Sequence, residues 1–324
     1  MKIKVKKKFY DIKKHGITQS LISKFLECRQ AARYYLQGYE SIYNRLPLTE
    51  GSIGHEVLQH AYEDIKTGKL KTIPSKQQVI KYTKRVEKQW LKENSRKDPR
   101  ALEHVEYSLT TMEATLPAYF DFWRKDLKQI KWLGLEESFA LPYVLPDGRK
   151  TILRGKKDGE FLKKGLWLFE TKFKSQISES NLIDTLSFDT QVLLYLRALK
   201  HIHKRTPEGV LYNVIRRTCL QRRKAESLAQ FAKRLKDDIE NRPDFYFMRF
   251  EIATDDFDLE KFDIELEGII KDFYDWIEGK VPHYKNTYNC VGKYGRCDFL
   301  PCCGMNDFSA LKKRKILFKE LEDF

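Results

Sequence analysis

Residues 135–173 read LEESFALPYVLPDGRKTILRGKKDGEFLKKGLWLFETKF, and this stretch decides the fold. It contains three β-type segments, separated by Pro-Asp-Gly and Lys-Lys-Gly turns, at residues 135–144, 151–162 and 166–173. Turns as short as these join antiparallel neighbours. The stretch therefore predicts a three-stranded meander.

Three charged residues on the second and third predicted strands are candidates for a catalytic centre. Glu170 and Lys172 are two positions apart, so their side chains project from the same face, within reach of Asp158 on the neighbouring strand. Two carboxylates suit Mg²⁺ or Mn²⁺, and an ammonium group beside them can hold a water that attacks phosphorus. For Glu170-x-Lys172 alone, the alternative is a charge pair on the surface of a half-exposed sheet.

Helical patterns lie on both sides of the meander. Before it, apolar residues at helical spacing predict a helix from 18 to about 37 that carries Cys28, a helix from about 53 to 66, and a helical stretch from about 75 to 131 with an interruption near Asp98-Pro99. After it, the patterns predict helices at about 184–200, 224–239 and 256–278 and strands at 209–215 and 245–252. We therefore expect one α/β domain with a helical insertion and a cysteine-rich tail.

Two further groups of polar residues accompany the charged ones. His55 follows Gly51-Ser52-Ile53-Gly54 at the start of the second predicted helix, where an imidazole can be a third metal ligand or, alternatively, a helix cap. Gln191 and Tyr195 are four residues apart, so they share one face of a predicted helix. Both can hydrogen-bond a phosphate or a base, and an ordinary amphipathic helix is the alternative.

Taken together, these groups resemble the motif series of the PD-(D/E)XK nucleases of the RecB type. The motifs are, in order, Gly51-x3-His55, Gly155-x2-Asp158, Glu170-x-Lys172 and Gln191-x3-Tyr195. The resemblance runs from about residue 18 to residue 303. It implies a restriction-endonuclease-like core, in which helices flank a central mixed sheet.

The resemblance also assigns roles to the motif residues. It implies that His55, Asp158, Glu170 and the backbone carbonyl of Thr171 surround the Mg²⁺ or Mn²⁺ ion. Lys172 would position the attacking water. Gln191 and Tyr195 would contact the DNA strand near the scissile phosphate.

The six cysteines are expected to be free thiols. No segment has the length of an apolar membrane span, and the lysine-rich start of the chain lacks the apolar stretch of a signal peptide. We therefore expect a cytoplasmic protein in a reducing compartment, where three thiols crowded into one short tail segment indicate metal or cluster ligation. Cys219 has no matching partner and is expected to be an ordinary thiol.

The tail cysteines have the spacing Cys290-x6-Cys297-x5-Cys303, and Cys28 adds a fourth thiolate from the first predicted helix. Four thiolates can hold a [4Fe-4S] cluster. One early and three late cysteines resemble the iron-sulfur subset of the same nucleases, which includes the AddB nuclease domain, exonuclease V and the CRISPR-associated RecB-like exonucleases. Zinc is the alternative metal, and Cys302 is the alternative to Cys303 as the fourth ligand.

The charge of the chain favours a polyanionic partner. Charged residues make up 33% of the chain and the formal net charge is +15, which points to nucleic acid before an anionic membrane surface. Basic residues interleaved with aromatic ones are candidates for a strand-guiding track, with solvated surface as the alternative. They are Lys2 to Lys14, Arg216, Arg217, Arg222, Arg223 and Lys312 to Lys315.

These patterns predict a metal-dependent DNA exonuclease that acts on single-stranded ends in recombination, repair or phage DNA processing, with a helicase or recombinase as a candidate partner. The step from nuclease to exonuclease comes from the resemblance alone. The alternative is a catalytically inactive DNA-binding or docking subunit of a recombination complex. We expect a single nuclease domain over 1–324, made of a helical region at 18–132, a catalytic core at 133–280, a cluster-binding tail at 281–304 and a basic extension at 305–324.

Overall fold

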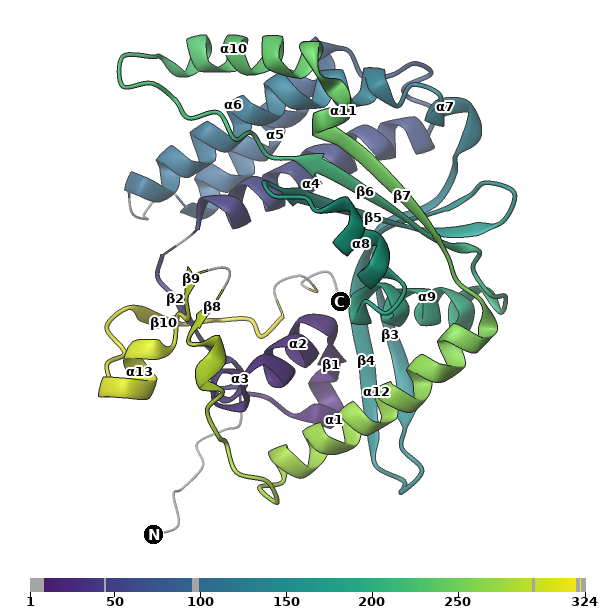
Figure 1. Cartoon of the computed structure of the whole chain (residues 1–324), viewed down its shortest axis with the longest axis vertical. Helices are drawn as coiled ribbons and strands as arrows, with labels where there is room; N and C mark the ends of the chain where they lie inside the picture. Colours follow the sequence, from purple (N-terminus) through teal and green to yellow (C-terminus); the bar gives the residue numbers. More distant parts are fainter. Residues whose placement is uncertain (1–8, 44, 95–98, 293–294, 319–320, 322–324) are drawn as a thin grey trace.

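A mixed six-stranded sheet forms the centre of the computed structural model, which describes residues 9–43, 45–94, 99–292, 295–318 and 321. The strands follow the order β1-β4-β5-β6-β7, and β3 pairs with the other edge of β4 (Figure 1). Their bounds are β1 Ile17–Thr18, β3 Lys131–Val144, β4 Lys150–Leu162, β5 Leu166–Lys174, β6 Gly209–Arg216 and β7 Phe247–Ala253. The pairs β3–β4 and β4–β5 are antiparallel, and β5–β6 is parallel. The predicted meander and the predicted α/β class with a mixed central sheet are confirmed.

Helices cover both faces of the sheet (Figure 1). One face packs against α4 Leu46–Lys66, α5 Lys76–Asn94, α6 Pro99–Phe122 and α10 Leu228–Asn241. The other face packs against α2 Gln19–Glu27, α9 Thr190–His203 and α12 Asp256–Ile277. Successive residues of a strand point to opposite faces, so Phe169 enters the first core and Leu168 the second.

Shorter elements complete the described chain. The helical ones are α1 Ile12–His15, α3 Arg29–Leu36, α7 Asp126–Gln129, α8 Glu179–Leu186, α11 Pro243–Tyr246, η1 Thr287–Asn289 and α13 Leu300–Met305. The remaining strands form two small sheets, β2 Tyr39–Ser41 with β10 Leu311–Lys313 and β8 Val291–Gly292 with β9 Gly295–Arg296. None of the helices in the described residues combines the length and apolar character that crossing a membrane requires.

The single helix expected from 18 to 37 is wrong, because Cys28 interrupts it. α2 ends one residue before Cys28 and α3 begins one residue after it, with Cys28 in an extended conformation at φ −164° and ψ 113°. The Cys28 N–H still donates to the carbonyl of Lys24, and its carbonyl accepts from the N–H of Ala32. Backbone groups at the break are thereby satisfied, and Cys28 lies at a corner between two helices.

The single helix expected at 184–200 is also wrong, because it is divided into α8 and α9. Asp189 caps the second of them, since its side chain accepts hydrogen bonds from the N–H groups of Gln191 and Val192 at 2.9 and 3.0 Å. The cap places Gln191 in the first turn of α9.

β4 and β5 diverge where two of the sequence motifs meet. Their pairing extends from Leu162 with Leu166 to Gly159 with Phe169, and beyond this point β5 continues along β6. β1 pairs with the same edge of β4 further along, at residues 153–154. The edge of β4 is therefore open between these two pairings.

Gly54 allows α4 to lie directly against β5. A Cβ atom at this position would lie 2.3 Å from Cζ of Phe173. The Phe173 ring also meets the ring of His55 edge-on, at 5.6 Å between centroids. The close approach of the two elements therefore sets where His55 lies relative to β5.

We predict that Gly54→Ala lowers the free energy of unfolding by about 1–3 kcal/mol, because the added Cβ overlaps the Phe173 ring in a packed core. Gly268→Ala in α12 is the matched control, since no atom lies within 4 Å of a Cβ added there. It should raise the free energy of unfolding by about 0.5–1 kcal/mol through helix propensity. Urea unfolding followed by circular dichroism measures both, and equal effects would contradict the packing role of Gly54.

Candidate metal centre

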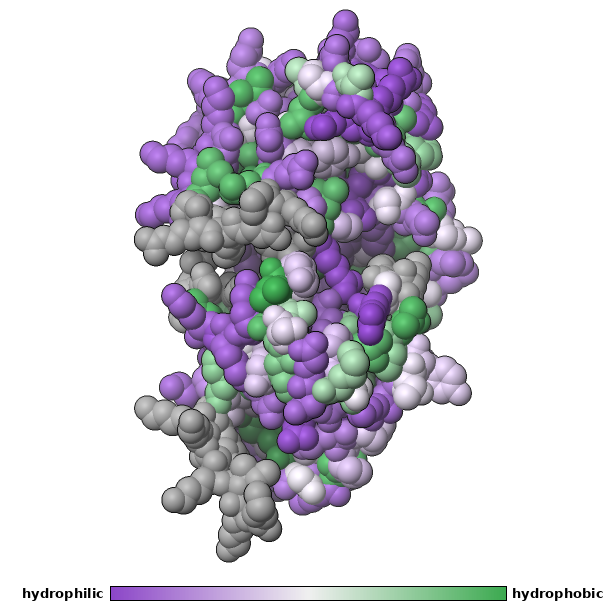
Figure 2. All heavy atoms as spheres, turned by 90° about the vertical axis from the view of Figure 1, so that its left-hand side faces the viewer, coloured by the Kyte–Doolittle hydropathy of each residue, from purple (hydrophilic) through white to green (hydrophobic). Residues whose placement is uncertain are grey.

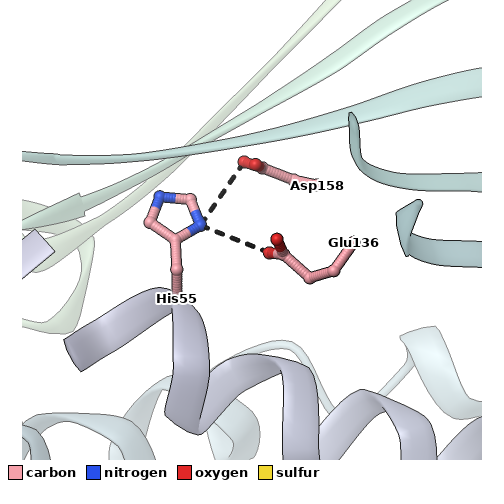
Figure 3. Close-up of side chains that lie close together, drawn as sticks. All are labelled: His55, Glu136 and Asp158. Carbon is pink, nitrogen blue, oxygen red and sulfur yellow. Dashed lines mark ion pairs between the residues drawn. The ribbon is translucent and has the colours of Figure 1, made fainter. Parts of the chain in front are cut away.

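Side chains from three elements converge at the open edge of β4. His55 comes from α4, Glu136 from β3 and Asp158 from β4 (Figure 3). Nδ1 of His55 lies 3.7 Å from Oε1 of Glu136 and 3.6 Å from Oδ2 of Asp158. In the part of the chain that the structure describes, this candidate triad is the one group of three or more His, Cys, Asp or Glu residues whose ligand atoms all lie within 4.8 Å of one another.

Glu136 reaches the site through the register of the β3–β4 hairpin. The residue pairs on either side of it place Glu136 opposite Asp158, on the same face of the two strands. Its φ is +50°, a conformation that is rare outside glycine and tends to occur at functional sites. Glu136 was not among the ligands expected from the sequence, although counting pairs outward from the Pro-Asp-Gly turn leads to it.

Where β4 and β5 diverge, the side chain of Asp158 accepts a hydrogen bond from the backbone of β5 in place of a backbone carbonyl of β4. Its Oδ2 accepts a hydrogen bond from the N–H of Thr171 at 2.6 Å. Thr171 is buried, and its hydroxyl accepts a hydrogen bond from Nδ2 of Asn213 at 3.2 Å. The Asp158 carboxylate is therefore held by the backbone of a buried strand.

Glu170, Lys172 and Gln191 form a hydrogen-bonded group on the α9 side of β5. Lys172 donates to Oε1 of Glu170 and, at 3.0 Å, to Oε1 of Gln191. Nε2 of Gln191 donates to the same Glu170 oxygen at 2.9 Å. Glu170 is 1% exposed, and its second oxygen, Oε2, is buried without a hydrogen-bond partner. A buried carboxylate oxygen costs free energy unless it is bound, so Oε2 is an open ligand position.

Tyr195 is enclosed between α9 and β4. It is 6% exposed and meets the ring of Phe139 edge-on at 5.6 Å. A Cβ at Gly155 would lie 2.8 Å from Cε1 of Tyr195, so the glycine makes room for the tyrosine. The glycine of the Gly155-x2-Asp158 motif therefore has a packing role. Gly51, the glycine of the first motif, has no such packing role, because nothing lies within 4 Å of a Cβ added there.

The ionisable groups of the site shift one another's pKa values. Burial alone would lower the pKa of His55, but the carboxylates of Asp158 and Glu136 outweigh it and raise the pKa to about 9. Burial raises the pKa of Asp158, and burial together with the charge of Asp158 raises the pKa of Glu170 to about 7. Burial opposes the charge of Lys172, yet Glu170 and Asp158 raise its pKa above the ordinary value. Asp158 and Glu170 thus hold their protons more tightly than they would in water, and a bound cation would lower both pKa values.

These residues fit a divalent cation. Two carboxylates and an imidazole lie within 4.8 Å of one another, and oxygen and imidazole donors suit Mg²⁺ and Mn²⁺. The unpartnered oxygen of Glu170 offers a further donor nearby. The site is therefore chemically suited to the hydrolysis of a negatively charged ester.

Four cysteines lie near one another around the corner between α2 and α3. Burial is the largest cause of the raised pKa values of Cys297 and Cys303, and the thiols of Cys28 and Cys290 raise both further. Sγ of Cys28 also accepts a hydrogen bond from the N–H of Asn286 in the tail at 3.4 Å. These four described sulfur atoms do not come within 4.8 Å of one another as a compact group.

Cys302 and Cys219 have other partners. Cys302 is 4% exposed, and its thiol donates to the carbonyl of Asp307 at 3.1 Å. Cys219 is exposed and lies 3.7 Å from the carbonyl oxygen of Ser175.

The basic residues near the end of β6 divide into two kinds. Arg217 lies 3.8 Å from the buried carboxylate of Glu50, and Arg216 donates to a backbone carbonyl of α11 at 2.8 Å. Both therefore join elements of the fold. Arg222 and Arg223 are exposed.

The basic clusters at the chain ends form no continuous exposed strip in the described residues. Within Lys312 to Lys315, Arg314 is buried and donates to the carbonyl of Leu317 at 2.8 Å. Residues Lys2 to Lys8 lie outside the described residues. The side of the molecule that carries the tail is nevertheless largely hydrophilic, and it is hollowed between its upper and lower parts (Figure 2).

The comparisons with known proteins agree with this geometry. A family model described as the PD-(D/E)XK nuclease superfamily matches residues 17–304. The matched range begins at β1 and contains the candidate triad, the Glu170–Lys172 pair and the four grouped cysteines. No curated protein matches the chain.

We predict that the affinity for Mn²⁺ rises with pH between about pH 6 and pH 8. His55 must lose its proton to bind a cation, and with a pKa of about 9 it carries that proton throughout this range. The apparent dissociation constant should therefore fall by at least about tenfold per pH unit, with release of about one proton from His55 and, below about pH 7, a second from Glu170. Calorimetric titration in buffers of different ionisation enthalpy measures both quantities. His55→Gln should bind more weakly and with less dependence on pH, and a pH-independent wild-type affinity would exclude His55 as a ligand.

Proposed function

The chain belongs to the PD-(D/E)XK nuclease superfamily, and from this membership we propose that it is a metal-dependent DNA exonuclease of the RecB-like type. The observation that carries the proposal is the candidate triad, whose ligand atoms lie within 4.8 Å of one another beside the Glu170–Lys172 pair. Hydrolysis of a phosphodiester needs positive charge against the phosphate and a group that positions water. A cation held by the triad would meet the first requirement, and Lys172 would meet the second.

The proposed metal ligands are His55, Asp158, Glu170 and the backbone carbonyl of Thr171, to which the structure adds Glu136 as a candidate. A bound divalent cation supplies Lewis-acid stabilisation of the negative charge that develops on the phosphate. Oε2 of Glu170 supports its part in this set, because the oxygen is buried and has no hydrogen-bond partner.

Lys172 is proposed to hold the attacking water. Its ammonium group stays charged because Glu170 and Asp158 raise its pKa, and Glu170 and Gln191 fix its position. The oxygen of the water bonds to phosphorus and releases a proton to solvent, the bond from phosphorus to the leaving sugar oxygen breaks, and that oxygen takes up a proton from solvent. Lys172 thereby orients the nucleophile and stabilises the charge of the phosphate.

Gln191 and Tyr195 are proposed as positioning residues. The amide of Gln191 bonds to both Lys172 and Glu170, and Tyr195 is buried against Gly155. The hydrogen bonds of Gln191 favour support of Lys172 over direct contact with the DNA strand, and Tyr195, which is 6% exposed, offers that strand little surface.

Single-stranded DNA ends are the proposed substrate, in recombination, repair or phage DNA processing. The resemblance of the four motifs to RecB-type nucleases and the net charge of +15 support this choice. The proposed organisation is one nuclease domain over 1–324, with the helical region at 18–132, the core at 133–280, the cluster-binding tail at 281–304 and the extension at 305–324.

We predict that Asp158→Ala and Lys172→Ala each reduce DNA cleavage by at least about a thousandfold, because the first removes a metal ligand and the second the partner of the water. DNA binding should remain largely intact. Digestion of end-labelled linear DNA with Mg²⁺ or Mn²⁺ measures cleavage, and Asp121→Ala, which changes an exposed aspartate on α6, is the control.

A closed circular DNA in the same assay separates the kinds of nuclease. Loss of linear strands with the circle intact supports an exonuclease, whereas cleavage of the circle indicates an endonuclease. Unchanged turnover in either variant would overturn the mechanism. Wild-type protein that binds DNA but cleaves neither form would favour an inactive docking subunit.

A [4Fe-4S] cluster is proposed at Cys28, Cys290, Cys297 and Cys303. The mutual effects of these thiols on their pKa values support the assignment, because such effects require proximity. Besides burial, three thiols, those of Cys297, Cys28 and Cys290, raise the pKa of Cys303, whereas among the thiols only Cys297 raises the pKa of Cys302, which favours Cys303 over Cys302 as the fourth ligand.

The separation of the four sulfur atoms favours a cluster over zinc. Tetrahedral zinc with bonds of about 2.3 Å would bring thiolate sulfurs to about 3.8 Å from one another. The described sulfur atoms do not form a group within 4.8 Å. A cluster of four irons is larger than one ion and spreads its ligands further apart.

We predict that Cys28→Ser releases the iron and abolishes the brown colour of purified protein, and that it lowers solubility, because the tail loses the cluster as one of its attachments to α2. Cys302→Ser is the matched control and should retain iron. Iron analysis and visible absorption spectra measure both variants. A colourless wild-type protein with one bound zinc would reject the cluster assignment.

A further inference from the structure

One face of the β3–β4 hairpin is half-exposed beyond the candidate triad. Residues alternate along β4, and those that are buried are Thr151, Leu153, Gly155 and Lys157. The residues between them are half-exposed, namely Ile152, Arg154, Lys156 and Asp158. Leu153 lies in the core shared with α9 and α12, so the half-exposed set projects from the opposite face of the strand.

This face carries two cations in line with the triad. Arg154 and Lys156 alternate with Leu153 and Gly155, so both project from the face opposite the core that holds Leu153, and Lys156 contacts Glu136 of the triad. The residues paired with these cations on β3 are small, Ser138 opposite Lys156 and Ala140 opposite Arg154. Both cations are half-exposed beside these short side chains.

The row of positive groups begins at the triad itself. Nζ of Lys156 lies 3.2 Å from Oε2 of Glu136. At the other end, Arg154 pairs in register with Thr18 of β1, the N-cap residue of α2. The N-terminus of a helix carries partial positive charge, so α2 extends the same potential beyond Arg154.

From these placements we infer that Arg154 and Lys156, together with the N-terminus of α2, bind successive phosphates of one DNA strand next to the scissile bond. We call these groups the phosphate strip. Two residues of a β-strand span about 6.7 Å, which is comparable to the separation of neighbouring phosphates along an extended DNA strand. Cations with this spacing beside the triad would hold the DNA strand along β4.

The inference rests on the proposed function and adds the direction in which the substrate leaves the metal centre. The strand would run from the triad towards β1 and α2, and not towards α10 at the other end of the sheet. Phosphate contacts of this kind carry no sequence information, so the strip suits a nuclease that degrades any sequence.

The test measures binding apart from cleavage. Fluorescence anisotropy follows the binding of a labelled oligodeoxythymidine to the full-length protein in EDTA at several salt concentrations. Arg154→Gln should lower the slope of log affinity against log salt by about 0.7, which is about fivefold in affinity at about 0.1 M salt. Arg154→Lys should keep the wild-type slope, because it retains the charge. If Arg154 only stabilised the fold, its replacement would not change the salt dependence of DNA binding according to the charge of the new side chain.

Lys131→Gln is the matched control, since Lys131 is an exposed lysine at the other end of β3. It should bind with the wild-type slope, and Arg154→Gln combined with Lys156→Gln should lose about twice as much slope as Arg154→Gln alone. If Arg154→Gln binds DNA with the wild-type slope, the phosphate strip is wrong. Cleavage of DNA by the wild-type protein would in that case still support the nuclease proposal. A slope that depends on Arg154 in a protein that cleaves nothing would support the strip and remove the nuclease proposal.

Discussion

The hydrogen bond from the Thr171 N–H to the carboxylate of Asp158 is the contact on which the rest of the site depends. Where β4 and β5 diverge, a buried backbone N–H loses its strand partner, and leaving it unpaired would cost about 1–3 kcal/mol. Asp158 supplies the missing acceptor. One residue thus allows the strands to separate and places a carboxylate in the opening. Glu170 and Lys172 lie on one side of it and His55 and Glu136 on the other.

A buried polar chain supports this contact from behind. Thr171 accepts from Asn213, and Oδ1 of Asn213 accepts from Nε of Arg249 at 2.9 Å. Arg249 in turn donates to Asp126 at 2.6 Å and to the hydroxyl of Tyr119 at 3.0 Å. The chain crosses from β5 through β6 and β7 to the helical side. Because each member is hydrogen-bonded, the network restricts the movement of the segment that carries the metal ligands.

The two ends of the described chain meet beside the sheet. The break at Cys28 exposes the carbonyl of Glu27, which accepts from the side-chain amides of Asn286 and Asn289 at 2.9 and 2.8 Å. These contacts join residues more than 250 positions apart, so they close a long loop and restrict the unfolded chain. They also hold α2, whose N-cap lies in register with Arg154. The tail is therefore linked physically to the surface beside the metal centre.

The sequence by itself determined the three-stranded meander, the shared face of Glu170 and Lys172, and the helices around them, because alternation and helical periodicity are local properties of the chain. Glu136, the break at Cys28 and the burial of Tyr195 were decided by the tertiary structure. Glu136 enters through strand register, Cys28 through the docking of a distant tail, and Tyr195 through the space that Gly155 leaves on another strand. Each depends on contacts between segments far apart in the chain, which no local pattern encodes.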